Sequence, residues 1–195
     1  MAAANDDDPV GPIPVERDPD DYDRLRRRVL WSIPVGLYVV GSRAGARRNL
    51  MTVSWVTQVA QEPKLVGIGV ERRAYTHELM TEGGVFSLSF LARRDRALVR
   101  HFVKPVQDAD VDDETGVGIM NGEAVRQAST GAPILELAVA WLDCEIRHTL
   151  PLGSHTWFVG EVMDAGAADS ELEPGTATAD DGILRMEDTR MNYGG

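Results

Sequence analysis

The chain has 195 residues, of which 43% are hydrophobic and 26% charged, and this composition suits one globular domain with a sizeable core. Its formal net charge of -11 argues against a surface for nucleic acid or an anionic membrane, because both need an excess of Lys and Arg. The single cysteine, Cys144, excludes an intrachain disulfide.

The N-terminal region differs in composition from the rest of the chain. Residues 1–19 hold four Asp and four Pro with few large apolar groups, which predicts a flexible arm before a single domain over residues 20–195. The first eight residues lack the basic and apolar parts of a secretory signal, and no apolar run approaches the roughly 18 residues of a membrane helix. We therefore expect a cytoplasmic protein that binds neither membranes nor nucleic acid. Asp20 or Asp21 is the expected cap of a helix through about Ser32.

From Gly36 onward the hydrophobic period changes from helical to alternating, which predicts strands. The expected strands are Gly36–Gly41, Met51–Ala60, Leu65–Val70, Val85–Leu91, Leu137–Arg147 and Thr156–Ala165. Two short helices are expected between them, from Thr76 to Gly83 and from Asp95 to Val103, and the acidic residues 108–114 are expected in a loop. A doubly wound parallel sheet needs a crossover helix after nearly every strand, so the pattern favours a mainly β, antiparallel barrel with short peripheral helices.

Hydroxyl and amide side chains follow one face of the predicted strand Met51–Ala60. Thr52, Ser54 and Gln58 lie on this face, and the alternate positions are mostly apolar. A half-buried strand with one solvated face explains the pattern without a ligand. The alternative is that this face forms one wall of a ligand site.

The residues after this strand favour the ligand site. Gly67 and Gly69 share one face of the next strand and indicate either a bend or the close approach of another group, such as a planar ring. Arg72, Arg73 and Thr76 follow at a predicted helix start, where cations and unpaired backbone N–H groups suit a phosphate. An exposed charged turn with an ordinary Thr cap is the other explanation. The four histidines show no metal-ligand spacing, so no metal is expected.

Several motifs occur in a characteristic order, although none is specific alone. They are Asn49-x-Met51-Thr52-x-Ser54, Thr57, Glu62-Pro63, Thr76-His77-Glu78-Leu79, Gly84-Val-Phe86 and Gly153-Ser154-His155. Over roughly residues 30–165 this set resembles the flavin reductase-like family with its FMN-binding split barrel. The resemblance implies a closed, Greek-key-like antiparallel barrel that forms a homodimer and holds FMN, or FAD, near the dimer interface.

The resemblance also implies roles for individual residues. The isoalloxazine and ribityl parts of the flavin would be lined, partly through backbone N–H groups, by Thr52, Val53, Ser54 and Thr57, with Asn49 at the mouth of the site. The phosphate end would be surrounded by Arg72, Arg73, Thr76 and His77.

Several positions depart from the family pattern, among them Leu50 where glycine is frequent, Gln58 where serine is frequent, and Ser154. Relatives that use NADH or NADPH often have an aspartate where this chain has Ser154, while the neighbouring His155 is retained. The resemblance implies that His155 positions the nicotinamide, and a strand-end histidine without a role is the alternative. Trp55 stands where serine is frequent, and it either stacks on a ring or fills the core.

The function implied by the resemblance is NAD(P)H-dependent reduction of FMN or FAD. Hydride would pass from NADH or NADPH to flavin N5, and the reduced flavin would serve a partner such as a flavin-dependent monooxygenase. The cofactors carry this chemistry, so the absence of a catalytic dyad does not count against it. Two alternatives stay open: an FMN-retaining electron carrier or flavoprotein with another substrate, which Ser154 favours, and a barrel that has lost flavin and serves as a scaffold.

Overall fold

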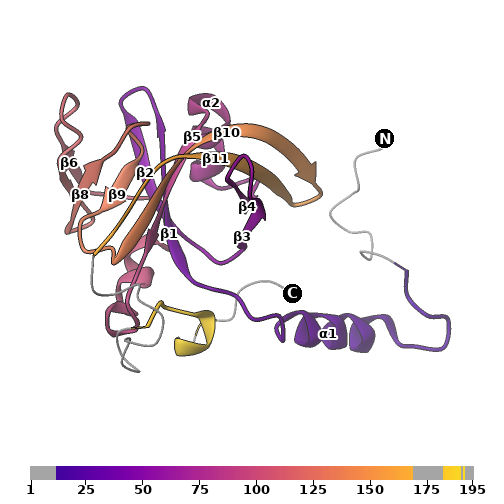
Figure 1. The fold of residues 1–195 in the computed structure, drawn as a ribbon. Coiled ribbons are helices and arrows are strands. Elements are labelled where there is room, and N and C mark those ends of the chain that lie inside the picture. The colour runs from indigo at the N-terminus through magenta and orange to yellow at the C-terminus, as the bar shows by residue number, and fades with distance from the viewer. Residues whose placement is uncertain (1–11, 169–181, 190, 192–195) are drawn as a thin grey trace.

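An antiparallel sheet of seven strands forms the main body of the molecule (Figure 1). The computed structural model describes residues 12–168, 182–189 and 191. In spatial order the strands are β2 (Arg47–Val53), β1 (Tyr38–Ala44), β5 (Val85–Phe90), β10 (Ala140–Leu152), β11 (His155–Ala167), β4 (Leu65–Glu71) and β3 (Val56–Ala60). Every neighbouring pair is antiparallel. The expected mainly β, antiparallel fold class is confirmed.

A second sheet and short helices surround the main sheet. The four strands of the second sheet are β6 (Ala109–Val111), β7 (Gly118–Met120), β8 (Glu123–Gln127) and β9 (Pro133–Leu135). The helices are α1 (Pro19–Leu30), α2 (Tyr75–Gly83) and the 3-10 segments η1 (Arg93–Asp95), η2 (Leu98–Phe102) and η3 (Met186–Asp188). The region expected as one helix from Asp95 to Val103 is therefore two short 3-10 turns, and the expected acidic loop contains β6. Among the described residues, no helix combines the length and apolarity that crossing a membrane requires.

The core has two parts. Inside the main sheet, fully buried side chains from five of its strands pack together, among them Val40, Ile68, Phe86 and Phe158. A second cluster, which includes Leu50, Phe102 and Met120, joins the main sheet to η2 and the small sheet. These two clusters hold the strand ends and helix starts around the candidate site in fixed positions.

The expected strand Met51–Ala60 is two strands. β2 pairs with β1 through Val53, whereas β3 begins at Val56 and pairs with β4 at the other edge of the sheet. Ser54 and Trp55 connect them, and the carbonyl of Trp55 accepts from the Gly69 N–H at 2.9 Å. The side-chain alternation shifts phase at this connection, because Met51 and Val53 face the core and so does Val56, whereas Val59 is 44% exposed.

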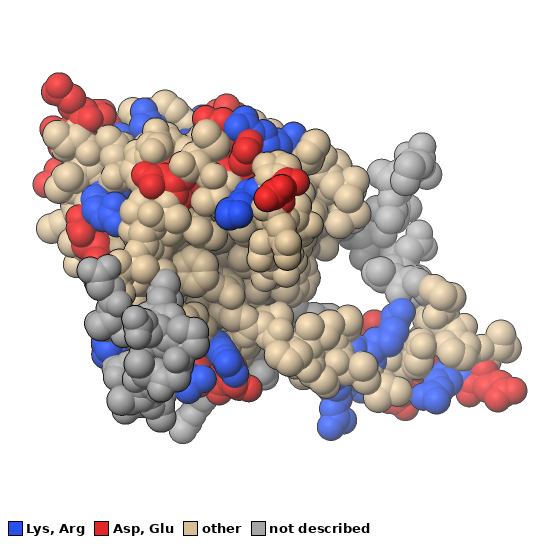
Figure 2. Space-filling model, in the orientation of Figure 1, with Lys and Arg blue, Asp and Glu red and all other residues tan. Residues whose placement is uncertain are grey.

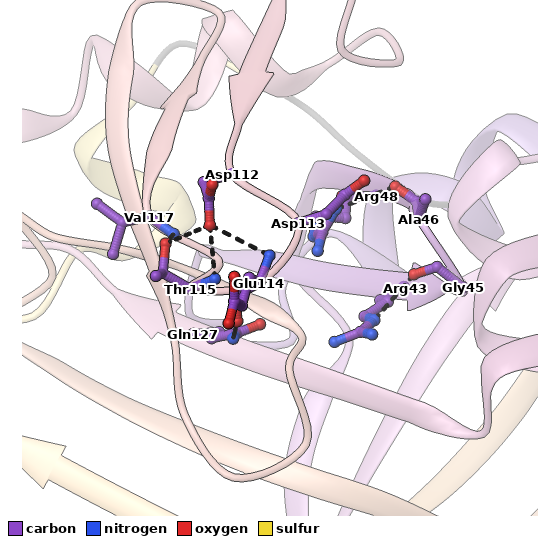
Figure 3. Close-up of polar contacts among 10 residues, drawn as sticks. All are labelled: Arg43, Gly45, Ala46, Arg48, Asp112, Asp113, Glu114, Thr115, Val117 and Gln127. Carbon is purple, nitrogen blue, oxygen red and sulfur yellow. Dashed lines mark hydrogen bonds and ion pairs between the residues drawn. The ribbon is translucent and has the colours of Figure 1, made fainter.

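Two arginines at the start of β2 form ion pairs with neighbouring elements. Arg47 pairs with Glu78 and Glu82 of α2. The side chain of Arg48 is only 6% exposed, and its Nη1 donates to Asp113 at 2.6 Å (Figure 3). Asp112 stabilises the same turn by accepting from the backbone N–H of Thr115 at 2.7 Å. Both arginines therefore hold α2 and the β6–β7 connection against β2.

Helix α1 lies apart from the barrel (Figures 1 and 2). Its N-cap is Asp18, whose carboxylate accepts from the N–H groups of Asp20 and Asp21, so the helix starts earlier than expected, with Pro19 in the first turn. It buries none of its residues, and Val29 and Trp31 at its C-terminal end are 60% and 48% exposed. Of the expected N-terminal arm, residues 1–11 lie outside the described part of the chain.

Candidate functional site

A cavity of about 320 Å³ opens where the end of β2 meets the start of α2. Segments distant in the chain complete it: the residues after η2 and the C-terminal segment. Its lining is Leu37, Asn49, Met51, Thr52, Val53, Ser54, Glu71, Arg73, Ala74, Tyr75, Thr76, Val103, Lys104, Pro105, Met186 and Met191. The volume is at the lower end of the roughly 300–1,000 Å³ typical of small-molecule and cofactor pockets.

The structure brings six of the ten residues expected at the site into this lining: Asn49, Thr52, Val53, Ser54, Arg73 and Thr76. The other four, Thr57, Arg72, His77 and His155, are not part of it. Four of the six lie in β2 and α2, whose proximity follows from the β2–α2 contacts, while Ser54 directly follows β2 and Arg73 lies just before α2. The sequence therefore located this wall of the cavity.

Ser54 offers the cavity an unused hydrogen-bonding group. Its side chain is 1% exposed, and its Oγ has no hydrogen-bond partner in the structure. Buried polar atoms in proteins nearly always have partners, so an exception in a cavity wall indicates a place for a ligand atom. The neighbouring Thr52 differs, because its hydroxyl donates to the Val99 carbonyl at 2.5 Å.

Asn49 is a buried part of the cavity wall, whereas the resemblance implied a place at the mouth of the site. The side chain is 2% exposed, and Nδ2 donates to Oγ1 of Thr76 at 2.8 Å. Its Oδ1 accepts from the backbone N–H of Val106, also at 2.8 Å. One amide thus connects three walls of the cavity: β2, the first turn of α2, and the segment after η2.

The cavity carries two cationic side chains and a helix start. Arg73 lies before α2, and Lys104 comes from the segment after η2. The N-cap residue Ala74 provides no side-chain acceptor to the first turn, and Ala74, Tyr75 and Thr76 all line the cavity. Cations beside the positive end of a helix suit an anionic group such as a phosphate. The sequence interpretation missed Lys104, which local pattern does not connect with α2.

The C-terminal segment supplies the remaining wall through Met186 and Met191. Leu184 is fully buried, and its N–H donates to the Leu91 carbonyl at 2.9 Å. Further along, Asp188 accepts from Nε of Arg93 at 3.0 Å. These contacts hold the segment around Met186 in place, Met186 and Met191 both pack against the second core cluster, and no local sequence pattern predicts this placement.

Two of the four residues outside the lining, Thr57 and His77, lie elsewhere in the molecule. Thr57 is exposed on the edge strand β3. His77 approaches Oγ1 of Thr156 with Nε2 at 2.8 Å, and its ring contacts Phe158. Burial, assisted by the nearby positive charge of Arg72, lowers the pKa of His77 below its usual value. His77 is therefore packed between α2 and β11.

The two glycines of β4 give room to the protein's own tryptophans. Val66, Ile68 and Val70 of β4 face the core, so Gly67 and Gly69 face outward. A Cβ added at Gly67 would lie 2.5 Å from the indole of Trp157, and one at Gly69 would lie 3.1 Å from the indole of Trp55. The planar groups against this backbone are side chains of the chain itself. Trp55 accordingly belongs to the outer surface rather than to the core.

His155 lies beside Trp55, with ring centroids 4.5 Å apart. Its Nδ1 is 2.9 Å from the hydroxyl of Ser154, while Nε2 is buried and has no partner. Burial lowers the pKa of His155, and the negative charge of Glu71 opposes this effect. The imidazole is therefore predominantly neutral at neutral pH, with one ring nitrogen unused.

Other reactive chemistry receives no support from the described residues. Cys144 is fully buried, and burial raises the pKa of its thiol to about 12, which keeps it protonated. Within the described ranges, no group of three or more His, Cys, Asp or Glu side chains is arranged to hold a metal ion.

Comparisons with known proteins agree with this geometry. The family model "Flavin reductase like domain" matches residues 30–185. An NADH-dependent FAD reductase from Streptomyces globisporus is 35% identical over 148 residues, covering 76% of this chain and 78% of the relative. An NADPH-flavin oxidoreductase from Streptomyces viridifaciens is 32% identical over 150 residues, covering 74% and 73%.

Solved structures with the same fold include the styrene monooxygenase flavin reductase from Pseudomonas putida S12. It superimposes with a TM-score of 0.60 at 26% identity, covering 73% of this chain and 87% of that one.

Proposed function

The chain belongs to the flavin reductase-like family, and from this premise we propose that it reduces a flavin with NADH or NADPH. It is a flavin-binding oxidoreductase with the split-barrel fold of its relatives. We assign the flavin to the cavity at the β2–α2 junction. The observation that supports this site is the unpaired Ser54 hydroxyl in the cavity wall.

The residues present fit a flavin. Ser54 Oγ provides a hydrogen-bonding group for a polar ring edge or a ribityl hydroxyl. Arg73, Lys104 and the start of α2 provide the positive environment that a flavin phosphate needs. Apolar contact comes from Leu37, Met51 and Val53 on the same lining. The expected cofactor-binding roles of Asn49, Thr52, Val53, Ser54, Arg73 and Thr76 are retained in this proposal.

The chain's own part in the reaction is binding and orientation. When bound, a flavin accepts hydride from a reduced nicotinamide, and this chemistry belongs to the two cofactors. The protein has to hold the two rings at about 3 to 3.5 Å and keep bulk water away. Asn49 contributes by fixing the relative positions of the β2 and α2 walls, and Thr52 by anchoring β2 to η2.

We retain His155 as the residue that positions the nicotinamide, because its Nε2 lacks a partner and it lies at the end of β11 beside Ser54–Trp55. The imidazole is neutral, so it offers a hydrogen bond rather than a charge. Replacing His155 with Ala should lower NADH turnover and leave the affinity for flavin nearly unchanged. Unchanged turnover would contradict the role.

The finer parts of the proposal concern partners. FMN is retained as the expected flavin, with FAD as the other candidate. A flavin-dependent monooxygenase is retained as the partner that consumes the reduced flavin. A homodimer is supported by α1, because an isolated helix of 12 residues is marginal in water and this one buries no residue of its own chain. We retain a cytoplasmic location because Cys144 is a free thiol, which is typical of proteins in a reducing compartment.

The runner-up is a flavoprotein that retains FMN and carries electrons, which the replacement of an acidic residue by Ser154 favours. Gel filtration of the purified protein after loading with FMN separates the two. A reductase that supplies flavin should lose most of its yellow colour on dilution and should oxidise NADH only when flavin is added again. A protein that stays yellow through dilution would favour the carrier.

A further inference from the structure

Three ring side chains form a continuous outer aromatic face, defined here as Trp55, His155 and Trp157. This face lies outside the main sheet on β4 and β11, since the alternate residues of β4 face the core. Both indoles lie over Gly69, and the ring of Trp157 also covers Gly67. All three rings are half-buried, so part of each remains accessible.

A cation lies at one end of the outer aromatic face. The side chain of Arg72 is exposed, and its Nη1 lies 3.5 Å from the Gly153 carbonyl in the β10–β11 turn. Its backbone N–H donates to the Ser154 carbonyl at 3.0 Å, which ties the residue to the same turn. Arg73 instead lines the cavity. The two adjacent arginines therefore serve two different places.

The outer aromatic face and the cavity adjoin each other. Ser54 and Glu71 line the cavity, Trp55 directly follows Ser54, and His155 pairs with Glu71 across β11 and β4. A ligand on the outer aromatic face would extend to the edge of the cavity. A stacking surface beside a guanidinium is the chemistry that recognises a purine nucleotide.

We propose that the outer aromatic face binds the adenosine phosphate half of the nicotinamide nucleotide, with the purine stacked on the indoles and a phosphate on Arg72. This inference rests on the proposed function, because it assigns a second subsite to the same reaction. Stacking on an aromatic ring is tolerant of the base, so the indoles provide affinity. Arg72 provides the preference for a phosphorylated ligand.

The test uses the full-length, flavin-free protein and ADP as the probe. ADP should quench the indole fluorescence in a saturable way, and Trp55→Leu should weaken ADP binding about tenfold, within the range for one base stacked on one aromatic ring. The matched control is Trp141→Leu, because Trp141 stacks on Arg126 on other strands of the molecule. Equal ADP affinity in the two variants would overturn the proposal.

Arg72→Ala provides a second variant at an exposed position, which keeps the test valid if Trp55→Leu does not fold. It should weaken ADP binding while leaving adenosine binding unchanged, and equal losses for the two probes would contradict the proposal. A rise in sedimentation mass that depends on Trp55 without any response to ADP would also overturn it, since the face would then be an interface between copies.

Flavin reduction by NADH is measured in parallel. If ADP binding depends on Trp55 but NADH does not reduce the flavin, the proposed function is contradicted. If NADH reduces the flavin but ADP binding does not depend on Trp55, only this inference is contradicted.

Discussion

Two buried serines allow the ligand role of a single hydroxyl to be tested. Ser42 and Ser54 are 0% and 1% exposed, and the Oγ of each lacks a hydrogen-bond partner, yet only Ser54 lines the cavity. Ser54→Ala should weaken flavin binding by about 2- to 10-fold, since a net hydrogen bond contributes roughly 0.5–1.5 kcal/mol. Ser42→Ala should leave the affinity unchanged. Titration of flavin fluorescence measures both.

The variants Ser42→Ala and Ser54→Ala also distinguish an effect on flavin binding from an effect on protein stability. Each substitution removes a buried polar atom without a partner, so neither should lower the melting temperature of the flavin-free protein. Thermal melts of both variants provide this control. A large loss of stability in Ser54→Ala alone would assign the hydroxyl a structural role.

The cationic residues of the cavity predict a phosphate preference. Arg73→Ala and Lys104→Ala should each weaken FMN about tenfold or more and leave riboflavin nearly unchanged, because hydrogen bonds to charged groups contribute roughly 1.5–3 kcal/mol. Arg72→Ala is the neighbouring control, since Arg72 is not part of the lining. Calorimetric titration with FMN and riboflavin measures the difference, and parallel losses for the two ligands would refute a phosphate site here.

His77 gives the stability of the protein a defined pH dependence. Its pKa in the folded state is lowered, so as the pH falls the unfolded chain takes up the proton first, near pH 6.5. Stabilisation by neutral His77 is complete above that pH and is lost as the pH falls through the folded-state pKa. The difference in melting temperature between the protein and His77→Asn should therefore shrink as the pH is lowered below about 6.5. A difference that is constant with pH would contradict this account.

At the scale of elements, Asn49 joins β2, α2 and the segment after η2. Asn49→Ala should lower the free energy of unfolding by about 1–3 kcal/mol, because it leaves the Val106 N–H and the Thr76 hydroxyl without their partner. Asn49→Asp retains an acceptor for Val106 but no donor for Thr76, so its loss should be intermediate. Chemical denaturation measures the series, and full stability in Asn49→Ala would show that these bonds contribute little.

The sequence predicted the larger elements because their side-chain periods are long enough to detect. The helix that ends at Gly84 illustrates this, since Gly84 has the left-handed φ of 68° that glycine favours at a helix C-terminus. Strands of three residues, such as Ala109–Val111 and Pro133–Leu135, contain too few alternations to be recognised. The break at Ser54–Trp55 is not visible in the sequence, because apolar residue types still alternate at Val53, Trp55 and Val59 although the structure turns Val56 to the core instead.

The candidate site was predictable where it is local in sequence. Ser54, Arg73 and Thr76 come from one short region, and their residue types carry the signal for a phosphorylated ligand. Lys104 and Met186 reach the cavity only through tertiary packing, which no local pattern encodes. The glycines of β4 indicate a bend or the close approach of another group, and the groups that lie against them are the rings of Trp55 and Trp157.

At the scale of the whole molecule, charges of both signs are interspersed on the face drawn in Figure 2. The cavity, with its cationic residues, is accordingly the place where a single small anion would be held rather than an extended polyanion. The outer aromatic face adjoins this cavity, so two ligands could meet at Ser54 and Glu71. This arrangement is what a reaction between two bound nucleotides requires.

Anaerobic rapid mixing of the flavin-loaded protein with NADH, and separately with NADPH, tests the central claim most directly. Loss of the oxidised-flavin absorbance, at a rate that saturates with the nucleotide and far exceeds that of free flavin, is the result predicted for a flavin reductase. Ser54→Ala should require more flavin to reach the same rate. Flavin that binds in the cavity yet stays oxidised with both nucleotides would contradict the account.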